Sequence, residues 1–143
     1  MRCEDIMKRD VHCLRIDDTV RDAAVLLRDH NIGFLPVCDE DTVVRGTLTD
    51  RDIALRIVAD DLPTDTTVGS VMTMDEIVTC RPADDLKRAQ QLMGQKHKSR
   101  ILVTEDSGRL VGVISLSDIA EFEDGPTAAN TMRRVSERET RTQ

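Results

Sequence analysis

The chain has 143 residues, enough for one ordinary domain or for two small halves that share a core. Its hydrophobic content of 39% and charged content of 33% are typical of a soluble protein, and no apolar run approaches the roughly 18 residues of a membrane span. The net charge of -7 disfavours sequence-independent binding of nucleic acid, which depends on Lys and Arg at the phosphates. No apolar signal segment begins the chain, so we expect a cytoplasmic protein without a membrane partner.

The four cysteines are dispersed without a C-x-x-C pair, which disfavours a zinc ribbon or a thioredoxin-type motif. In a reducing cytoplasm we expect free thiols. The three histidines, His12, His30 and His97, do not share a helix face with a cysteine or carboxylate at metal-ligand spacing. We therefore expect no metal site and no required cofactor, with a thiol or metal sensor kept as an alternative. The sequence also lacks a nucleophile elbow and a phosphate-binding glycine loop, so we expect no enzymatic activity.

The predicted elements occur in the same order in two halves of the chain. Each half should contain a short helix, a strand, an amphipathic helix, two strands joined by a turn, and a second helix. In the first half these are expected near residues 2–7, 11–16, 19–31, 34–38, 43–48 and 52–59. In the second half the counterparts are expected near residues 68–72, 77–80, 86–93, 100–103, 110–114 and 118–123.

The amphipathic helix of the first half has signals at both ends. Thr19 and Asp22 have the form of a capping box, in which each side chain accepts a hydrogen bond from the other residue's backbone N–H. The helix should end near Asn31, because asparagine tolerates the left-handed conformation. The apolar stripe predicted to face the core consists of Val20, Ala23, Ala24 and Leu27.

One motif occurs twice and relates the two halves. Residues 46–53 read Gly-Thr-Leu-Thr-Asp-Arg-Asp-Ile, and residues 112–119 read Gly-Val-Ile-Ser-Leu-Ser-Asp-Ile, 66 positions further along. Each copy predicts a strand that runs directly into a helix. The surrounding sequence aligns without a gap from position 20 to position 53, which predicts two structural repeats related by a pseudo-two-fold axis, with two equivalent clefts between them.

The doubled motif resembles a tandem pair of CBS domains, the regulatory modules named after cystathionine beta-synthase. Further residues that carry the resemblance are Asp5-Ile6-Met7, Leu35-Pro36-Val37 and Ser70-Val71-Met72-Thr73. The resemblance implies an α+β fold of two β-α-β-β-α repeats packed as one compact pair. It assigns residues 2–60 and 68–125 to the repeats, 61–67 to a connector, and 126–143 to a polar tail that is either disordered or a solvated helix.

The resemblance also implies a regulatory module that binds AMP, ADP, ATP or S-adenosylmethionine, one ligand in each cleft. The aspartate and hydroxyl residue of each motif copy would hold the ribose of one ligand. These residues are Thr49 and Asp52 in the first copy and Ser115 and Asp118 in the second. A carboxylate at the first turn of a helix suits this role, because it presents acceptors to a vicinal diol.

The family's phosphate-binding cation corresponds to Arg100, which would face the Thr49 and Asp52 site, with Lys98 and Arg51 as further candidates. The equivalent position in the first repeat is Phe34. We therefore expect the two clefts to differ, with a phosphorylated nucleotide at the Asp52 site and a nucleoside, or nothing, at the Asp118 site.

The resemblance further implies a homodimer in which two pairs form a flat disc, and a regulated partner protein that the sequence does not identify. The helix faces expected to form the dimer contact carry Ile53, Ile57 and Val58, and Leu116, Ile119 and Phe122. Ligand binding would change the geometry that the partner recognises. A ligand-free interaction or structural module is the alternative, because aspartate at the start of a helix is also an ordinary cap.

Overall fold

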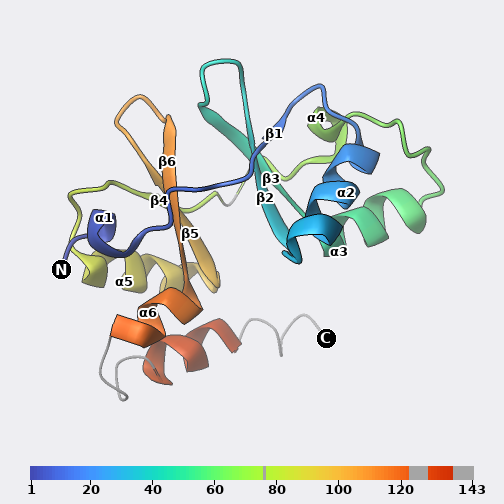
Figure 1. Ribbon diagram of the computed structural model, residues 1–143. Helices are drawn as coiled ribbons and strands as arrows, with labels where there is room; N and C mark the ends of the chain where they lie inside the picture. The colour runs from blue at the N-terminus through green and yellow to red at the C-terminus, as the bar shows by residue number, and fades with distance from the viewer. Residues whose placement is uncertain (76, 123–128, 137–143) are drawn as a thin grey trace. The chain divides into compact units, whose positions relative to one another are not determined.

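The computed structural model describes residues 1–75, 77–122 and 129–136. The chain divides into two compact units, which we call the terminal unit (residues 1–11 and 78–143) and the central unit (residues 12–77). Each unit is built on a three-stranded sheet, as Figure 1 shows. The mixed α+β fold with two repeats, predicted from the sequence, is confirmed.

The central unit has the strand order β1-β2-β3, with β1 parallel and β3 antiparallel to β2. Its strands are β1 (Leu14–Arg15), β2 (Phe34–Cys38) and β3 (Val44–Thr49). Its helices are α2 (Val20–His30), α3 (Asp50–Ile53), the π-helical segment η1 (Ala54–Val58) that continues α3, and α4 (Val68–Val71). Aliphatic side chains form its core: Leu14, Ala23, Leu27, Leu35, Val37, Leu48 and Val68.

Helix α2 confirms the end signals read from the sequence. Thr19 Oγ1 accepts a hydrogen bond from Asp22 N–H at 3.1 Å, and the Asp22 carboxylate accepts one from Thr19 N–H at 3.0 Å. Asn31 ends the helix with a left-handed φ of 51°. The predicted stripe is wrong at Ala24, which is exposed, because the face that meets the core turns toward Leu26 instead.

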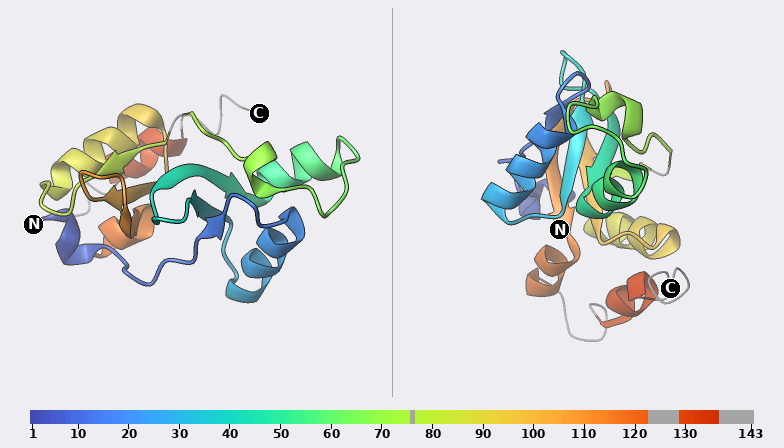
Figure 2. Two further views of the ribbon diagram at one scale, coloured as in Figure 1. Left: turned by 90° about the horizontal axis from the view of Figure 1, so that it is seen from above. Right: turned by 90° about the vertical axis from the view of Figure 1, so that its right-hand side faces the viewer.

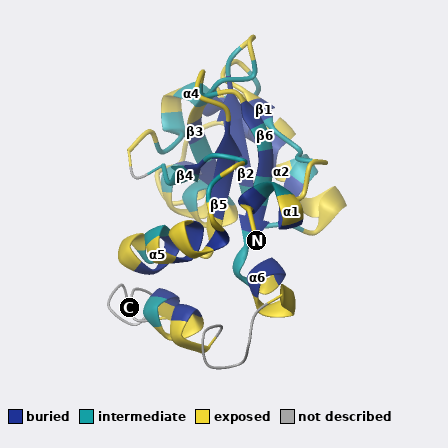
Figure 3. Ribbon diagram, turned by 90° about the vertical axis from the view of Figure 1, so that its left-hand side faces the viewer, coloured by how far each residue is buried: buried dark blue, intermediate teal, exposed yellow. Residues whose placement is uncertain are grey.

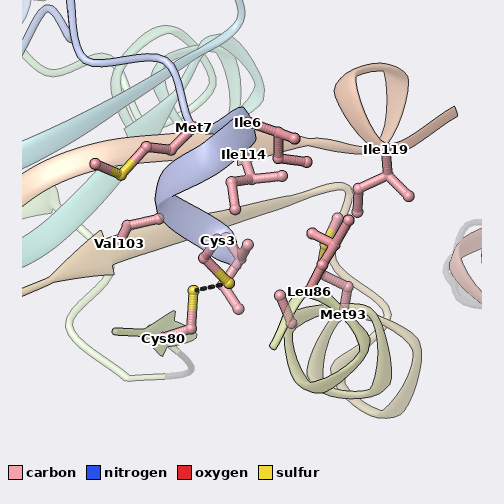
Figure 4. Packing of buried hydrophobic residues seen from close by; sticks show 11 residues of the cluster. Cys3, Ile6, Met7, Cys80, Leu86, Met93, Val103, Ile114 and Ile119 are labelled. Atoms are coloured by element: carbon pink, nitrogen blue, oxygen red, sulfur yellow. Dashed lines mark hydrogen bonds between the residues drawn. The ribbon is translucent and has the colours of Figure 1, made fainter. Parts of the chain in front are cut away.

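The terminal unit repeats this topology with the strand order β4-β5-β6. Its strands are β4 (Thr79–Cys80), β5 (Arg100–Thr104) and β6 (Leu110–Ser115), and its helices are α1 (Cys3–Ile6), α5 (Leu86–Lys96) and α6 (Leu116–Phe122). Figure 3 shows α5 with one buried and one exposed face. The buried face of α5, with Leu86, Ala89 and Met93, packs in the same core cluster as Ile114 and Ile119, and Figure 4 shows this cluster from close by.

The short helices α1 and α4 are exchanged between the repeats. Helix α1 precedes the first repeat in the sequence but lies in the terminal unit, where Cys3 N–H donates to Asp84 O at 2.9 Å. Helix α4 precedes the second repeat but lies in the central unit, where Val68 N–H donates to Asp18 O at 2.7 Å. Figures 1 and 2 show α1 beside α5 and the strands of the terminal unit. The compact units in space therefore differ from the repeats along the chain.

The tail predicted as disordered or as a solvated helix is helical over residues 129–136. Thr131 and Val135 are buried there, at 5% exposure each, and His97 Nδ1 lies 2.7 Å from Arg134 O. This helix is therefore packed rather than fully solvated. The rest of the predicted tail, residues 126–128 and 137–143, lies outside the described residues.

Two of the six residues expected to form a dimer contact belong to the cores of their own units. Ile57 is 3% exposed and Ile119 is fully buried, so both face inward and this part of the expectation is wrong. Val58 and Phe122 are exposed, at 73% and 53%. None of the helices within the described ranges has the length and apolarity needed to cross a membrane.

Candidate functional site

The first copy of the motif builds a capping box at the start of α3. Thr49 is the N-cap residue, and its Oγ1 accepts a hydrogen bond from Asp52 N–H at 3.0 Å. In return, Asp52 Oδ2 accepts a hydrogen bond from Thr49 N–H at 2.9 Å. The strand therefore passes directly into the helix with the Asp52 carboxylate fixed at its first turn.

The second copy builds the same arrangement in the terminal unit. Ser115 Oγ accepts from Asp118 N–H at 3.2 Å, and Asp118 Oδ2 accepts from Ser115 N–H at 2.9 Å. Ser115 Oγ also lies 2.8 Å from Ser117 Oγ. The predicted pairing of a hydroxyl residue with an aspartate is thus present in both units, and in each one the cap uses the Oδ2 oxygen of the aspartate.

The remaining oxygen of each aspartate faces a cation. Asp52 Oδ1 lies 3.6 Å from Arg56 Nη2, and Asp118 Oδ1 lies 3.4 Å from Lys8 Nζ. The Asp118 side chain is 9% exposed and that of Asp52 is 19% exposed. A ligand hydroxyl that reached either aspartate would therefore share Oδ1 with an ammonium or guanidinium group.

The two cations come from different places in the chain. Arg56 follows Asp52 by one helical turn, and its Nη1 also donates to Val71 O at 2.6 Å. Lys8 follows the exchanged helix α1 and is held by two backbone hydrogen bonds with Val113, at 2.9 and 3.0 Å. At the equivalent place in the central unit, Thr73 makes two such bonds of 2.9 Å with Thr47.

The glycine that opens each motif copy makes room for the exchanged segments. A Cβ added at Gly112 would lie 2.6 Å from Met7 Sδ, and one added at Gly46 would lie 2.7 Å from Met72 Sδ. Both distances are well below normal van der Waals contact, so any other residue would displace the methionine. The glycines therefore let the segment after each exchanged helix lie flat against its strand, which places Lys8 beside Asp118.

The three cations predicted from the sequence lie in different surroundings. Arg100 begins β5 and is the strand partner of Ser115, while Phe34 is correspondingly the partner of Thr49. Lys98 is half-buried after the end of α5, and Arg51 is exposed in α3. The contact of Arg100, Lys98 or Arg51 with a ligand at the Asp52 site stays a prediction.

Sequence reasoning missed Lys8 and Arg56 as neighbours of the two aspartates. The i,i+4 spacing of Asp52 and Arg56 was a usable signal, because such pairs face each other on a helix. Lys8 had no comparable signal, since its contact with Asp118 depends on the exchange of α1.

Two surface hollows lie away from the capping boxes. One, of about 540 Å³, lies in the central unit and is lined by residues 15–17 and 38–41. The other, of about 600 Å³, lies in the terminal unit and is lined by Thr79, Cys80, Arg81, Asp84 and Arg88. Within the described ranges, no group of three His, Cys, Asp or Glu side chains is placed to hold a metal ion.

Known proteins are similar to this chain over most of its length. The family model for the CBS domain matches residues 3–59 and again residues 68–125. The CBS domain-containing protein YhcV of Bacillus subtilis (strain 168) is 40% identical over 117 residues, which cover 82% of this chain and 81% of YhcV. Hypoxic response protein 1 of Mycobacterium tuberculosis is 33% identical over 116 residues, which cover 81% of this chain and 80% of that protein.

Solved structures agree with these matches. A crystal structure of hypoxic response protein I with two coordinated zinc ions is similar with a TM-score of 0.77 and 30% identity, covering 87% of this chain and 100% of that chain. The CBS domain pair of protein MJ0100, in complex with 5'-methylthioadenosine and S-adenosyl-L-methionine, is similar with a TM-score of 0.74 and 25% identity. That match covers 85% of this chain and 94% of that one.

Proposed function

The chain belongs to the CBS domain family as a tandem pair, and we propose that it is a cytoplasmic regulatory module that binds adenosine-containing ligands without performing a reaction. One observation carries the proposal: both motif copies present an aspartate Oδ1 oxygen at the first turn of a helix, beside a cation. The ligands named for the related MJ0100 pair contain adenosine, which supports this class of ligand.

The ribose hydroxyls of the ligand would donate to Oδ1 of Asp52 in one site and of Asp118 in the other. The adjacent cations, Arg56 and Lys8, favour an anionic ligand such as AMP, ADP or ATP over the positively charged S-adenosylmethionine. Lys8 also gives the Asp118 site a cation that comparison of the repeats did not predict. We therefore propose that both sites accept a phosphorylated nucleotide.

Titration calorimetry of the full chain with AMP, ADP, ATP and S-adenosylmethionine tests this function. We expect Asp52→Asn and Asp118→Asn each to weaken nucleotide binding about tenfold, because the amide keeps the size of the side chain but loses the charge-assisted hydrogen bond. Asp22→Asn is the matched control, since Asp22 has the same capping geometry at α2 outside either proposed site. Nucleotide binding that neither Asn variant weakens would show that the ribose is placed wrongly.

A ligand-free interaction module is the second candidate. It is favoured by the observation that both oxygens of Asp52 and of Asp118 already have partners within their own units. The absence of binding heat at millimolar nucleotide would support this candidate and exclude the sensor. The zinc ions of hypoxic response protein I do not lead us to a zinc proposal, because the described residues offer no suitable group of three ligands.

The role of Arg100 is tested separately. If Arg100 contacts a phosphate, Arg100→Ala should weaken ATP binding about five- to tenfold and leave adenosine binding unchanged. Arg109→Ala is a suitable control, since Arg109 is another exposed arginine of the terminal unit. Equal effects of Arg100→Ala on ATP and adenosine would exclude the phosphate contact.

We also propose a homodimer that uses the exposed apolar side chains Leu55, Val58 and Phe122. Val58→Asp should shift the protein toward the monomer in sedimentation velocity, because it places a charge in an apolar contact. Met74→Asp, at another exposed apolar position, should not. A wild-type protein that is monomeric at high micromolar concentration would contradict the dimer. The regulated partner protein would then recognise the nucleotide-dependent form of this assembly.

A further inference from the structure

Two buried cysteines of the terminal unit lie in contact. The Sγ atoms of Cys3 and Cys80 are 3.5 Å apart, although the residues are 77 positions apart in the sequence. Cys3 begins α1 and is fully buried, and Cys80 ends β4 and is 2% exposed. Figure 4 shows the two sulfur atoms pointing toward each other within the core.

We propose that Cys3 and Cys80 form a reversible disulfide that fastens the exchanged N-terminal segment to the sheet of the terminal unit. A disulfide requires an S–S distance of about 2.05 Å, so the sulfur atoms must approach by roughly 1.5 Å. Helix α1 is a single turn of four residues, so a small movement of this segment is sufficient. Without the bond, backbone hydrogen bonds such as the one from Cys3 N–H to Asp84 O hold the segment.

The contact between the thiols assigns them different roles. Cys80 donates a hydrogen bond to Cys3 Sγ, which lowers the pKa of Cys3 and raises the pKa of Cys80. Because the thiolate is the reactive species, Cys3 is suited to make the first attack on a disulfide, and Cys80 to make the second.

An oxidant can approach from the side of Cys80. The hollow of about 600 Å³ that Cys80 lines is also lined by Arg81, Arg88 and Asp84. Two arginines against one aspartate suit a small organic disulfide, RSSR, that carries carboxylates. RSSR would enter from this side, and the Cys3 thiolate would attack it, which forms Cys3–S–S–R and releases RS⁻. Cys80, which no longer donates to a Cys3 thiolate, would then pass its proton to RS⁻, attack Cys3 Sγ and release the second RS⁻. In total, two protein thiols are oxidised and RSSR is reduced to two RSH.

The central unit supplies conservative replacements for this pair. Val68 is the counterpart of Cys3, because its N–H makes the equivalent backbone hydrogen bond from the start of α4. Leu14 is the counterpart of Cys80, because it has the equivalent strand partner. Both are fully buried. Cys3→Val and Cys80→Leu therefore remove a thiol and retain a packing that this fold already uses.

The test uses the full chain with Cys13→Ala and Cys38→Ala, so that only Cys3 and Cys80 remain, and oxidised glutathione as the probe. We expect the loss of two hydrogen atoms by intact mass, the loss of both thiols after denaturation, and a cross-linked peptide that joins Cys3 to Cys80. Because the disulfide closes a long loop, the Tm should rise by roughly 10 °C and return when the protein is reduced.

Adding Cys80→Leu to this background should abolish the loss of hydrogen and the rise in Tm. Glutathione adducts without the internal bond, links between chains, or an internal bond that lowers the Tm would each overturn the proposal. If the background variant does not fold, peptide mapping of the oxidised wild-type chain gives the same decision, since it shows whether Cys3 is joined to Cys80 or to another residue.

Discussion

The terminal and central units use the same motif but obtain the cation beside their aspartate in different ways. In both units a methionine side chain packs against the glycine of the motif, and a capping box begins the following helix. In the central unit the cation is Arg56, on the same helix as Asp52. In the terminal unit it is Lys8, which arrives with the exchanged helix α1. The local motif thus determines where the carboxylate lies, and the exchange determines the charge beside Asp118.

Among the substitutions, the largest expected effect comes from the two glycines. Gly46→Ala should lower the free energy of unfolding by about 3 kcal/mol, because the new Cβ would meet Met72 Sδ and also the backbone oxygen of Thr73, at 2.8 Å. Gly112→Ala should cost about 1.5 kcal/mol, since its nearest neighbours all belong to the flexible Met7 side chain. Urea unfolding measures both. Equal costs would contradict the difference, and Met7→Ala should relieve the cost of Gly112→Ala.

A pH effect should separate Cys38 of the central unit from its counterpart, Thr104 of the terminal unit. Burial, with the neighbouring Cys13, raises the pKa of Cys38 to about 12 from an ordinary value of 9.0. The folded state therefore retains the Cys38 proton in a pH range where the unfolded chain loses it. The resulting contribution to the free energy of unfolding is complete below pH 9 and falls as the pH rises toward 12. We expect a loss of up to about 4 kcal/mol in that interval. Chemical unfolding across this range should show a smaller loss of stability for Cys38→Thr than for the wild type. If the free energy of unfolding of Cys38→Thr falls with pH as steeply as that of the wild type, Cys38 is not the source of the pH effect.

Removal of each aspartate compares the two capping boxes. Asp118→Ala should lower the free energy of unfolding by about 2 kcal/mol, because it leaves a part-buried N–H of Ser115 without its acceptor and also removes the partner of Lys8. Asp52→Ala should cost about 1 kcal/mol, since its side chain is more exposed. Thermal unfolding measures the difference, and a larger cost for Asp52→Ala would reverse this ranking.

The smallest effects are expected from the cations. Arg56→Met should cost about 1 kcal/mol, since the guanidinium also donates to Val71 O at 2.6 Å. Lys8→Met should cost about 0.3 kcal/mol, because the Lys8 side chain is 68% exposed and exposed ion pairs contribute little. Urea unfolding at low and high salt tests this, with the Lys8 contribution expected to disappear at high salt. A cost for Lys8→Met above that for Arg56→Met would show that the exchanged segment depends on its ion pair.

Much of the fold could be predicted from the sequence because its signals are local. The box of Thr19 and Asp22 and the left-handed Asn31 are properties of neighbouring residues, and the structure has them where they were expected. The pairing of Thr49 with Asp52 and of Ser115 with Asp118 is also local, since each capping box spans four residues. The sequence by itself therefore determined the repeated elements, the family and the position of both carboxylates.

Only the tertiary structure decided the features that depend on distant segments. The exchange of α1 and α4 brings Lys8 to Asp118 and Cys3 to Cys80, and no spacing along the chain indicates either contact. The inward orientation of Ile57 and Ile119 likewise depends on how each helix packs on its own unit. The physical reason is the range of the interactions. A capping box satisfies its hydrogen bonds within one helical turn, so neighbouring residues are enough to predict it. A contact between distant segments depends on which apolar surfaces pack together, and several surfaces of this chain are apolar enough to do so.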